Sequence, residues 1–141
     1  MTGSFEVKSV EETWEIARLF AEDLKRGEVV CLEGDLGAGK TTFTQGLARA
    51  LNVRGRVTSP TFCIVQEHED AAGERLLVHM DLYRLNSEED VLGVGWEEYL
   101  ERGAIIVVEW PERAGSLIPE DARHVNFSYG EGVESRRIVI L

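Results

Sequence analysis

One short segment of the sequence has the spacing of glycine, lysine and hydroxyl residues that is typical of phosphate binding. Residues 34–41 read Gly-Asp-Leu-Gly-Ala-Gly-Lys-Thr and fit the pattern G-x-x-x-x-G-K-[ST]. The glycines let backbone N–H groups turn inward around a β-phosphate, and the start of the following helix adds its partial positive charge. Lys40 would reach the β- and γ-phosphate oxygens, and the Thr41 hydroxyl would ligate Mg²⁺. The nucleotide contacts predicted from this segment are Gly34, Asp35, Leu36, Gly37, Ala38, Gly39, Lys40, Thr41 and Thr42.

A phosphate loop of this kind needs a carboxylate at the end of a neighbouring strand to hold Mg²⁺ or its water. Glu109 follows the apolar run 105–108 directly, and Asp81 lies late in a second predicted strand. A glutamate departs from the more common aspartate, and its extra methylene permits ligation of the ion directly or through a water. We predict Thr41 and Glu109 as metal ligands, and Lys40, Asp81 and Glu109 as catalytic residues. Which carboxylate orients the attacking water stays open, as does the alternative that either is a plain surface carboxylate.

Two further features allow a structural or a functional interpretation. Trp110 follows Glu109 and precedes Pro111 at a strand exit, so it either packs in the core or lines the site. The segment Thr58-Ser59-Pro60-Thr61 is either a turn into a strand or a switch-like loop whose hydroxyls sense the γ-phosphate. The sequence contains no N-K-x-D element, the segment by which GTPases read guanine, and this favours ATP or a loosely selected nucleotide.

The elements that must position these residues alternate along the chain. Apolar or alternating patterns predict strands at 5–9, 28–32, 61–67, 76–83, 104–108, 123–129 and 136–141. Helix signals begin at Ser9, Lys40, Ser87 and Gly95. Residues 70–74 are turn-like and predict an antiparallel hairpin, and the run at 104–108 predicts a central strand. We therefore expect a three-layer P-loop NTPase fold of the α/β class, with a mixed, mainly parallel sheet, formed as one domain over residues 1–141.

The composition limits the classes of function. The formal net charge is −11, and only three lysines are present, so the chain is not expected to bind nucleic acid by itself. No apolar run approaches the roughly 18 residues that span a bilayer, and no signal peptide is visible, so a cytoplasmic protein is expected. Cys31 and Cys63 are interpreted as free thiols in a reducing compartment. The three histidines show no zinc-ligand spacing with these cysteines.

Taken together, four segments resemble the TsaE family, formerly called YjeE. They are the phosphate loop extended to Phe43, then Ser59-Pro60-Thr61-Phe62, then His79-Met80-Asp81-Leu82-Tyr83-Arg84, and finally Glu109-Trp110-Pro111-Glu112. Any one of these segments is weak evidence beyond a phosphate loop. Their order, their gaps and the total length make the resemblance specific over residues 5 to 141.

The resemblance implies a small ATPase of the bacterial machinery that makes threonylcarbamoyladenosine at position 37 of tRNA. Its partners would be a sugar-kinase-like heterodimer that transfers the threonylcarbamoyl group, and ATP hydrolysis would reset that complex between turnovers. The chain would meet tRNA only through that complex. The resemblance also implies site residues: Trp110 beside the nucleotide, Val10 and Thr13 near the adenine, Asp81 as a catalytic or nucleotide-contacting carboxylate, and Arg137 as a further candidate.

Two rival functions fit a phosphate loop on an α/β domain. One is a small-molecule kinase, which would need a substrate pocket and a lid in a chain that has little spare length for either. The other is a nucleotide-gated binding module that holds ATP as a switch and does not hydrolyse it. Transfer of labelled phosphate to a sugar or nucleoside would identify the kinase, and nucleotide-dependent association without hydrolysis would identify the module.

Overall fold

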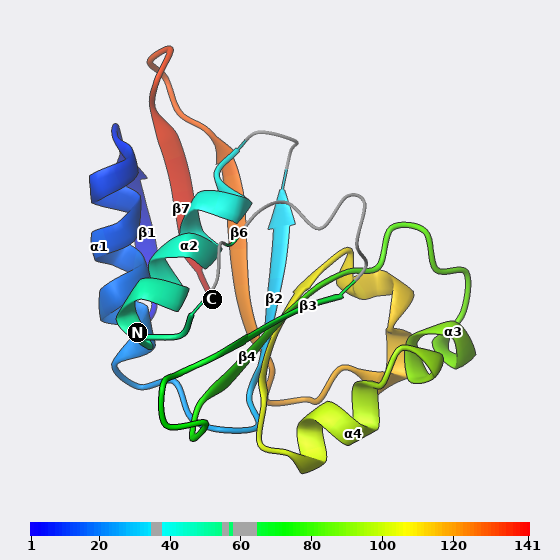
Figure 1. Cartoon of the computed structure of the whole chain (residues 1–141). Helices are drawn as coiled ribbons and strands as arrows, with labels where there is room; N and C mark the ends of the chain where they lie inside the picture. Colours follow the sequence, from blue (N-terminus) through cyan, green and yellow to red (C-terminus); the bar gives the residue numbers. More distant parts are fainter. Residues whose placement is uncertain (35–37, 55–56, 58–64) are drawn as a thin grey trace.

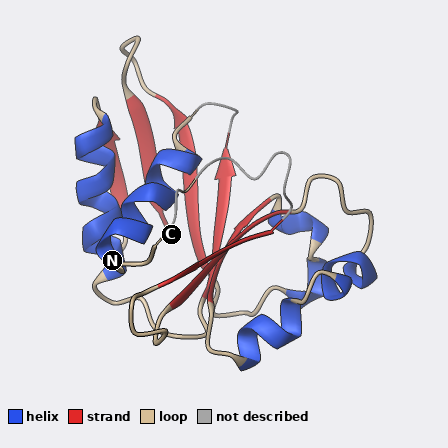
Figure 2. Cartoon of the chain, in the orientation of Figure 1, coloured by secondary structure: helices blue, strands red, loops and turns tan. Residues whose placement is uncertain are grey.

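The computed structural model describes residues 1–34, 38–54, 57 and 65–141. Within these residues the strands form one seven-stranded sheet in the order β1-β7-β6-β2-β5-β4-β3 (Figures 1 and 2). The strands are β1 (Gly3–Val7), β2 (Val29–Gly34), β3 (Val65–Glu69), β4 (Leu76–Asp81), β5 (Ile105–Glu109), β6 (Arg123–Tyr129) and β7 (Arg136–Ile140). The helices are α1 (Val10–Ala21), α2 (Lys40–Ala50), α3 (Glu88–Gly93) and α4 (Trp96–Glu101), with 3-10 turns η1 (Pro111–Arg113) and η2 (Gly115–Leu117).

The sheet has a parallel centre and antiparallel borders. Strands β6, β2, β5 and β4 pair in parallel, β3 is antiparallel to β4, and β7 is antiparallel to both β6 and β1. Helices α1 and α2 cover one face, while α3 and α4 lie on the other side of the sheet (Figure 1). The predicted P-loop NTPase fold, with its mixed, mainly parallel sheet and its hairpin, is therefore confirmed.

Each face of the sheet has its own apolar core. Under α1 and α2, the rings of Phe20, Phe43 and Phe127 meet edge to face, with centroids 5.6 and 5.5 Å apart. The opposite core packs side chains from β4 and β5 against Trp96 of α4. Strand β5 is buried along its whole length, as the apolar run at 104–108 predicted for a central strand.

Helices α1 and α2 pack closely because one of them carries a glycine at the contact. A Cβ atom added at Gly46 of α2 would lie 2.7 Å from the Cβ atom of Ala17 and 3.1 Å from the Cα atom of Trp14, both in α1. At the start of α1, Ser9 accepts from the backbone N–H of Glu12, and the Glu12 carboxylate accepts from the N–H of Lys8. These two contacts cap the first turn of α1, with Glu12 bonded to the residue before the N-cap.

Some predicted boundaries differ from the structure. The predicted strand at 61–67 falls partly outside the described residues, and its described part continues two residues further, to Glu69. Strand β4 ends at Asp81 and not at 83. The turn at 70–74 does join β3 to β4, and the Asp70 carboxylate there accepts from the backbone N–H groups of Glu74 and Arg75. Among the described residues, no helix has the length and apolar character needed to cross a membrane.

Candidate nucleotide-binding site

The described parts of the phosphate loop are shaped by two glycines with positive φ. Gly34 ends β2 at φ +145°, and an added Cβ atom there would lie 2.2 Å from the carbonyl oxygen of Phe127 in β6. Gly39 has φ +111° and caps the N-terminus of α2. Most residues other than glycine avoid this backbone region, so both positions require glycine. The predicted contacts at residues 35–37 and the predicted switch-like segment at 58–61 lie outside the described residues.

Lys40 is the first residue of α2, and its ammonium group lies across the ends of two strands. The Nζ atom donates to the carbonyl oxygen of Gly34 at 3.0 Å. It also lies 3.8 Å from the Oε1 atom of Glu109, at the end of β5. The cation thus lies where the phosphate loop, α2 and the central strand meet, near the partial positive charge of the helix N-terminus.

Glu109 is buried although it is a carboxylate, with 7% of its surface exposed. Its Oε2 atom lies 2.7 Å from the Nε2 atom of His79, a residue of β4 with no exposed surface. Sequence reasoning missed His79 as a member of this group. The available signal was its place two residues before Asp81, because alternate residues of a strand share one face.

Asp81 stands beside Glu109 in the register of β4 and β5. It is half-buried, and its Oδ1 atom accepts from the backbone N–H of Tyr83 at 3.0 Å. The two predicted strand-end carboxylates are therefore neighbours at one edge of the sheet, with Glu109 the deeper of the two.

Trp110 is exposed over 41% of its surface and does not pack in the core. Its ring packs against Tyr83, with centroids 4.9 Å apart. A hollow of about 150 Å³ lies between the ends of β2 and β5, and its lining includes Trp110, Lys40 and Glu112. Trp110 also has φ +60°, in the left-handed region, which is an outlier for a bulky residue of the kind found at functional sites.

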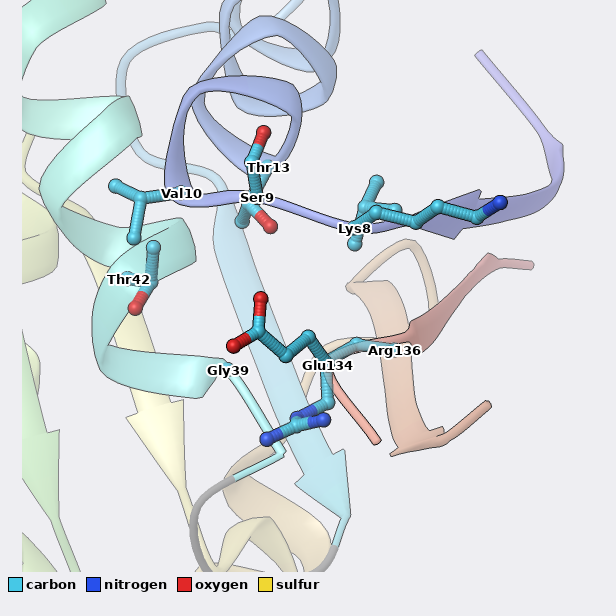
Figure 3. Close-up of a pocket in the computed structure, with 9 residues that line it drawn as sticks. Lys8, Ser9, Val10, Thr13, Gly39, Thr42, Glu134 and Arg136 are labelled. Atoms are coloured by element: carbon cyan, nitrogen blue, oxygen red, sulfur yellow. The ribbon is translucent and has the colours of Figure 1, made fainter. Parts of the chain in front are cut away.

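A second hollow, of about 310 Å³, has Gly39 in its lining (Figure 3). This volume falls in the range of small-molecule sites. Two predicted pocket residues, Val10 and Thr13 of α1, line it together with Gly39 and Thr42. The remaining lining residues are Val7, Lys8, Ser9, Glu134 and Arg136. The first turns of α1 and α2 and the start of β7 thus enclose a space that adjoins the phosphate loop.

Arg137, the further candidate from the resemblance, does not line this hollow. It is exposed, and its neighbour Arg136 takes a place in the lining. Successive residues of β7 point to opposite faces of the sheet, so only one of the two arginines can face α1. In Figure 3 the Glu134 side chain reaches from the β6–β7 connection toward α1 and Gly39, while Lys8 points away.

The residues present fit a magnesium ion bound together with nucleotide phosphates. The hydroxyl of Thr41, in the first turn of α2, and the carboxylate of Glu109 are oxygen donors of the kind that Mg²⁺ prefers. In the part of the chain that the structure describes, no three His, Cys, Asp or Glu side chains gather as a metal-binding group. Mg²⁺ in phosphate-transfer sites is usually held by one or two protein groups, with waters and substrate phosphates completing its shell, and needs no such protein cage.

Comparison with known proteins identifies the family that this chain resembles. A family model described as "Threonylcarbamoyl adenosine biosynthesis protein TsaE" matches residues 7–138. The chain is 45% identical over 111 residues to the tRNA threonylcarbamoyladenosine biosynthesis protein TsaE of Bacillus subtilis, covering 79% of this chain and 68% of the relative. It is 45% identical over 109 residues to the protein of the same name from Aquifex aeolicus, covering 76% and 75%. The crystal structure of YdiB from Bacillus subtilis superposes with a TM-score of 0.79 at 34% identity, covering 99% of this chain and 84% of YdiB.

Proposed function

The chain belongs to the TsaE family, and from this membership and the geometry of its site we propose that it is a Mg²⁺-dependent ATPase acting in the formation of threonylcarbamoyladenosine in tRNA. The observation that carries the proposal is the meeting of Lys40 and Glu109 at the end of the phosphate loop, with their charged groups 3.8 Å apart. A cation and a carboxylate placed there are the two charges that bind the phosphates and the metal ion of Mg-ATP.

Phosphate binding follows from the described contacts. The Lys40 ammonium group, which donates to the Gly34 carbonyl at 3.0 Å, would exchange this partner for β- and γ-phosphate oxygens. The N-terminus of α2 adds backbone N–H donors and the positive end of its dipole. Thr41 and Glu109 would hold Mg²⁺, which neutralises charge on the β- and γ-phosphates when it is bound.

Hydrolysis requires a water held in line with the bond to the γ-phosphate. We assign the orientation of this water to Asp81, because Glu109 is already engaged by His79 on one oxygen and faces Lys40 with the other. Asp81 lies at the same strand end and is only half-buried. With no arginine of this chain placed against the phosphates by the described contacts, slow turnover by the isolated chain is expected.

The nucleoside would lie in the hollow lined by Val10, Thr13 and Thr42, because this space adjoins Gly39 and has the volume of a small-molecule site. Val10 offers an apolar surface to a base, and the hydroxyl of Thr13 offers a hydrogen-bonding group. ATP is the proposed nucleotide, since the sequence lacks the guanine-reading element of GTPases.

The proposed partner is the sugar-kinase-like heterodimer that transfers the threonylcarbamoyl group, and the proposed role of hydrolysis is to reset that complex between turnovers. The relatives carry the name of this pathway. The chain has 26 acidic and 15 basic residues, so it would reach tRNA through the heterodimer and not through its own surface. This work would take place in the cytoplasm.

The proposal is tested by ATP hydrolysis in Mg²⁺, comparing the wild type with Lys40→Ala and with Lys25→Ala. Lys25 is exposed, so its substitution removes the same charge away from the site. Lys40→Ala is expected to lower hydrolysis at least about 100-fold, and Lys25→Ala to leave it unchanged. The γ-phosphate should be released as free inorganic phosphate, because water is the acceptor. Transfer to a sugar or nucleoside would replace the proposal by a kinase, and binding without hydrolysis, even with the heterodimer, would replace it by a nucleotide-gated module.

A further inference from the structure

His79 is a buried polar side chain whose contact with Glu109 occupies one oxygen of that carboxylate. We propose that His79 is a positioning residue, which holds the Glu109 carboxylate in the orientation needed to bind Mg²⁺. The inference rests on the proposed function, because it concerns the metal site of the same ATPase. It adds to the site a second residue of β4, besides Asp81.

The register of two parallel strands brings the pair together. His79 stands opposite Val107, and Asp81 stands opposite Glu109. Alternate residues of a strand share a face, so His79 and Glu109 lie on the same face of the sheet. Glu109 lies two residues further along β5 than Val107, the partner of His79. The 2.7 Å separation of His79 Nε2 and Glu109 Oε2 follows from this diagonal placement.

A glutamate at this position needs a second support more than an aspartate would. It has one more rotatable bond, so its carboxylate samples more orientations before it binds an ion. The contact with His79 fixes Oε2 from inside the sheet, and Oε1 then faces the Lys40 ammonium group at 3.8 Å. The carboxylate is thereby aimed at the place where Mg²⁺ and the phosphates would lie.

The chemistry of the two groups sets the direction of the hydrogen bond. An ionised carboxylate only accepts, so the His79 ring donates through an Nε2–H group. The Nδ1 atom of the ring is buried and has no hydrogen-bond partner among the described residues. Burying a ring with one nitrogen unbonded among the described residues lowers stability compared with an apolar side chain of similar size. We therefore attribute the presence of a histidine at this position to its contact with Glu109.

The test compares His79→Leu, which fills the space without a donor, with His79→Gln, whose amide N–H group can replace the ring donor. The matched control is His68→Leu: His68 is the other buried histidine of the described sheet, on β3, and its Nδ1 atom contacts the carbonyl of Arg54 and not Glu109. Binding of a non-hydrolysable ATP analogue is measured by calorimetry with Mg²⁺ and with EDTA. Thermal unfolding of each variant shows that it is folded.

His79→Leu is expected to weaken analogue binding in Mg²⁺ by roughly 10- to 100-fold, the range seen for groups that support metal ligands. Its binding in EDTA is expected to stay within about two-fold of wild type, because the phosphate loop is intact. His79→Gln should regain part of the loss, and His68→Leu should match wild type. In hydrolysis, kcat should fall for His79→Leu at saturating nucleotide.

A double-substitution cycle separates positioning from a general effect on folding. If His79 acts through Glu109, then His79→Leu adds nothing further once Glu109→Gln has removed the metal ligand. Equal Mg²⁺ dependence in wild type and His79→Leu would overturn the inference, and so would additive losses in the cycle or an equal loss in His68→Leu. A wild type whose analogue binding ignores Mg²⁺ would overturn the proposed metal site itself, which is a different result.

Discussion

Three polar side chains at the phosphate-binding edge are each held by a second group of the protein. Lys40 donates to the Gly34 carbonyl, Glu109 contacts His79, and Asp81 accepts from the backbone N–H of Tyr83. Side chains fixed in this way lose little freedom when a ligand arrives, so more of the interaction energy remains for binding and for the transition state. At the scale of the residue, these three side chains of the described part of the site are positioned by the protein itself.

Cys31 of β2 gives a prediction for alkaline pH. It is fully buried, and burial, followed by the charge of Glu33, raises the pKa of its thiol from 9.0 to about 12. Between these pH values the unfolded chain loses the thiol proton and the folded chain keeps it. The contribution of Cys31 to the unfolding free energy is therefore fully present below pH 9 and is lost as the pH rises toward 12. Cys31→Ala should therefore lose less stability than wild type between pH 8 and pH 10.5.

The measurement is chemical denaturation at both pH values, with both chains in reducing buffer. All other titratable groups are common to wild type and Cys31→Ala, so the difference between their changes in unfolding free energy isolates Cys31. Identical falls in unfolding free energy for wild type and Cys31→Ala would show that the thiol titrates alike in the folded and unfolded states.

At the scale of the element, the exit of β2 is constrained by β6. Gly34 pairs with Phe127, and an added Cβ atom would lie 2.2 Å from the Phe127 carbonyl oxygen, which is backbone and cannot move aside as a side chain could. Gly34→Ala is therefore expected to separate the ends of these strands, to lower the unfolding free energy by well over 2 kcal/mol and to abolish ATP binding.

Gly27→Ala is the matched control, because Gly27 also has positive φ, at +81°, but no atom lies within 4 Å of an added Cβ atom. It should cost only the backbone strain, about 1–2 kcal/mol. Denaturation curves and calorimetric titration with ATP distinguish the two. Equal losses in both variants would mean that the backbone angle, and not contact with β6, makes glycine necessary at residue 34.

The elements were largely predictable because their signals are local. The apolar run of β5, the Ser9 cap of α1 and the turn at Asp70 each depend on residues only a few positions apart. The role of His79 was not predictable in this way, because its partner is 30 residues away and the contact exists only in the observed register of β4 and β5. The same reason applies to β7, where the pairing with β6 and β1 decides which arginine faces α1.

At the scale of the whole molecule, strand direction gathers the site at one edge. The parallel strands β6, β2, β5 and β4 all end at this edge. The β6–β7 connection and the start of α1 lie at the same edge (Figure 1). From β2 the chain continues into α2 on one face, while the helices α3 and α4 between β4 and β5 lie on the other side. The site therefore lies at a point where the connections diverge, where open α/β sheets bind their ligands.

The sheet and its helices place a nucleotide site at this edge, and the proposed function makes that site respond to a partner. The most direct measurement is ATP hydrolysis by the purified chain, alone and with the heterodimer of the threonylcarbamoyladenosine pathway, for wild type, Lys40→Ala and Glu109→Ala. From the proposed function we expect slow hydrolysis by wild type alone, stimulation by the heterodimer, and loss of both in the two variants. Hydrolysis that is indifferent to Lys40 and to the heterodimer would contradict it, because the phosphate loop would then not be the active site.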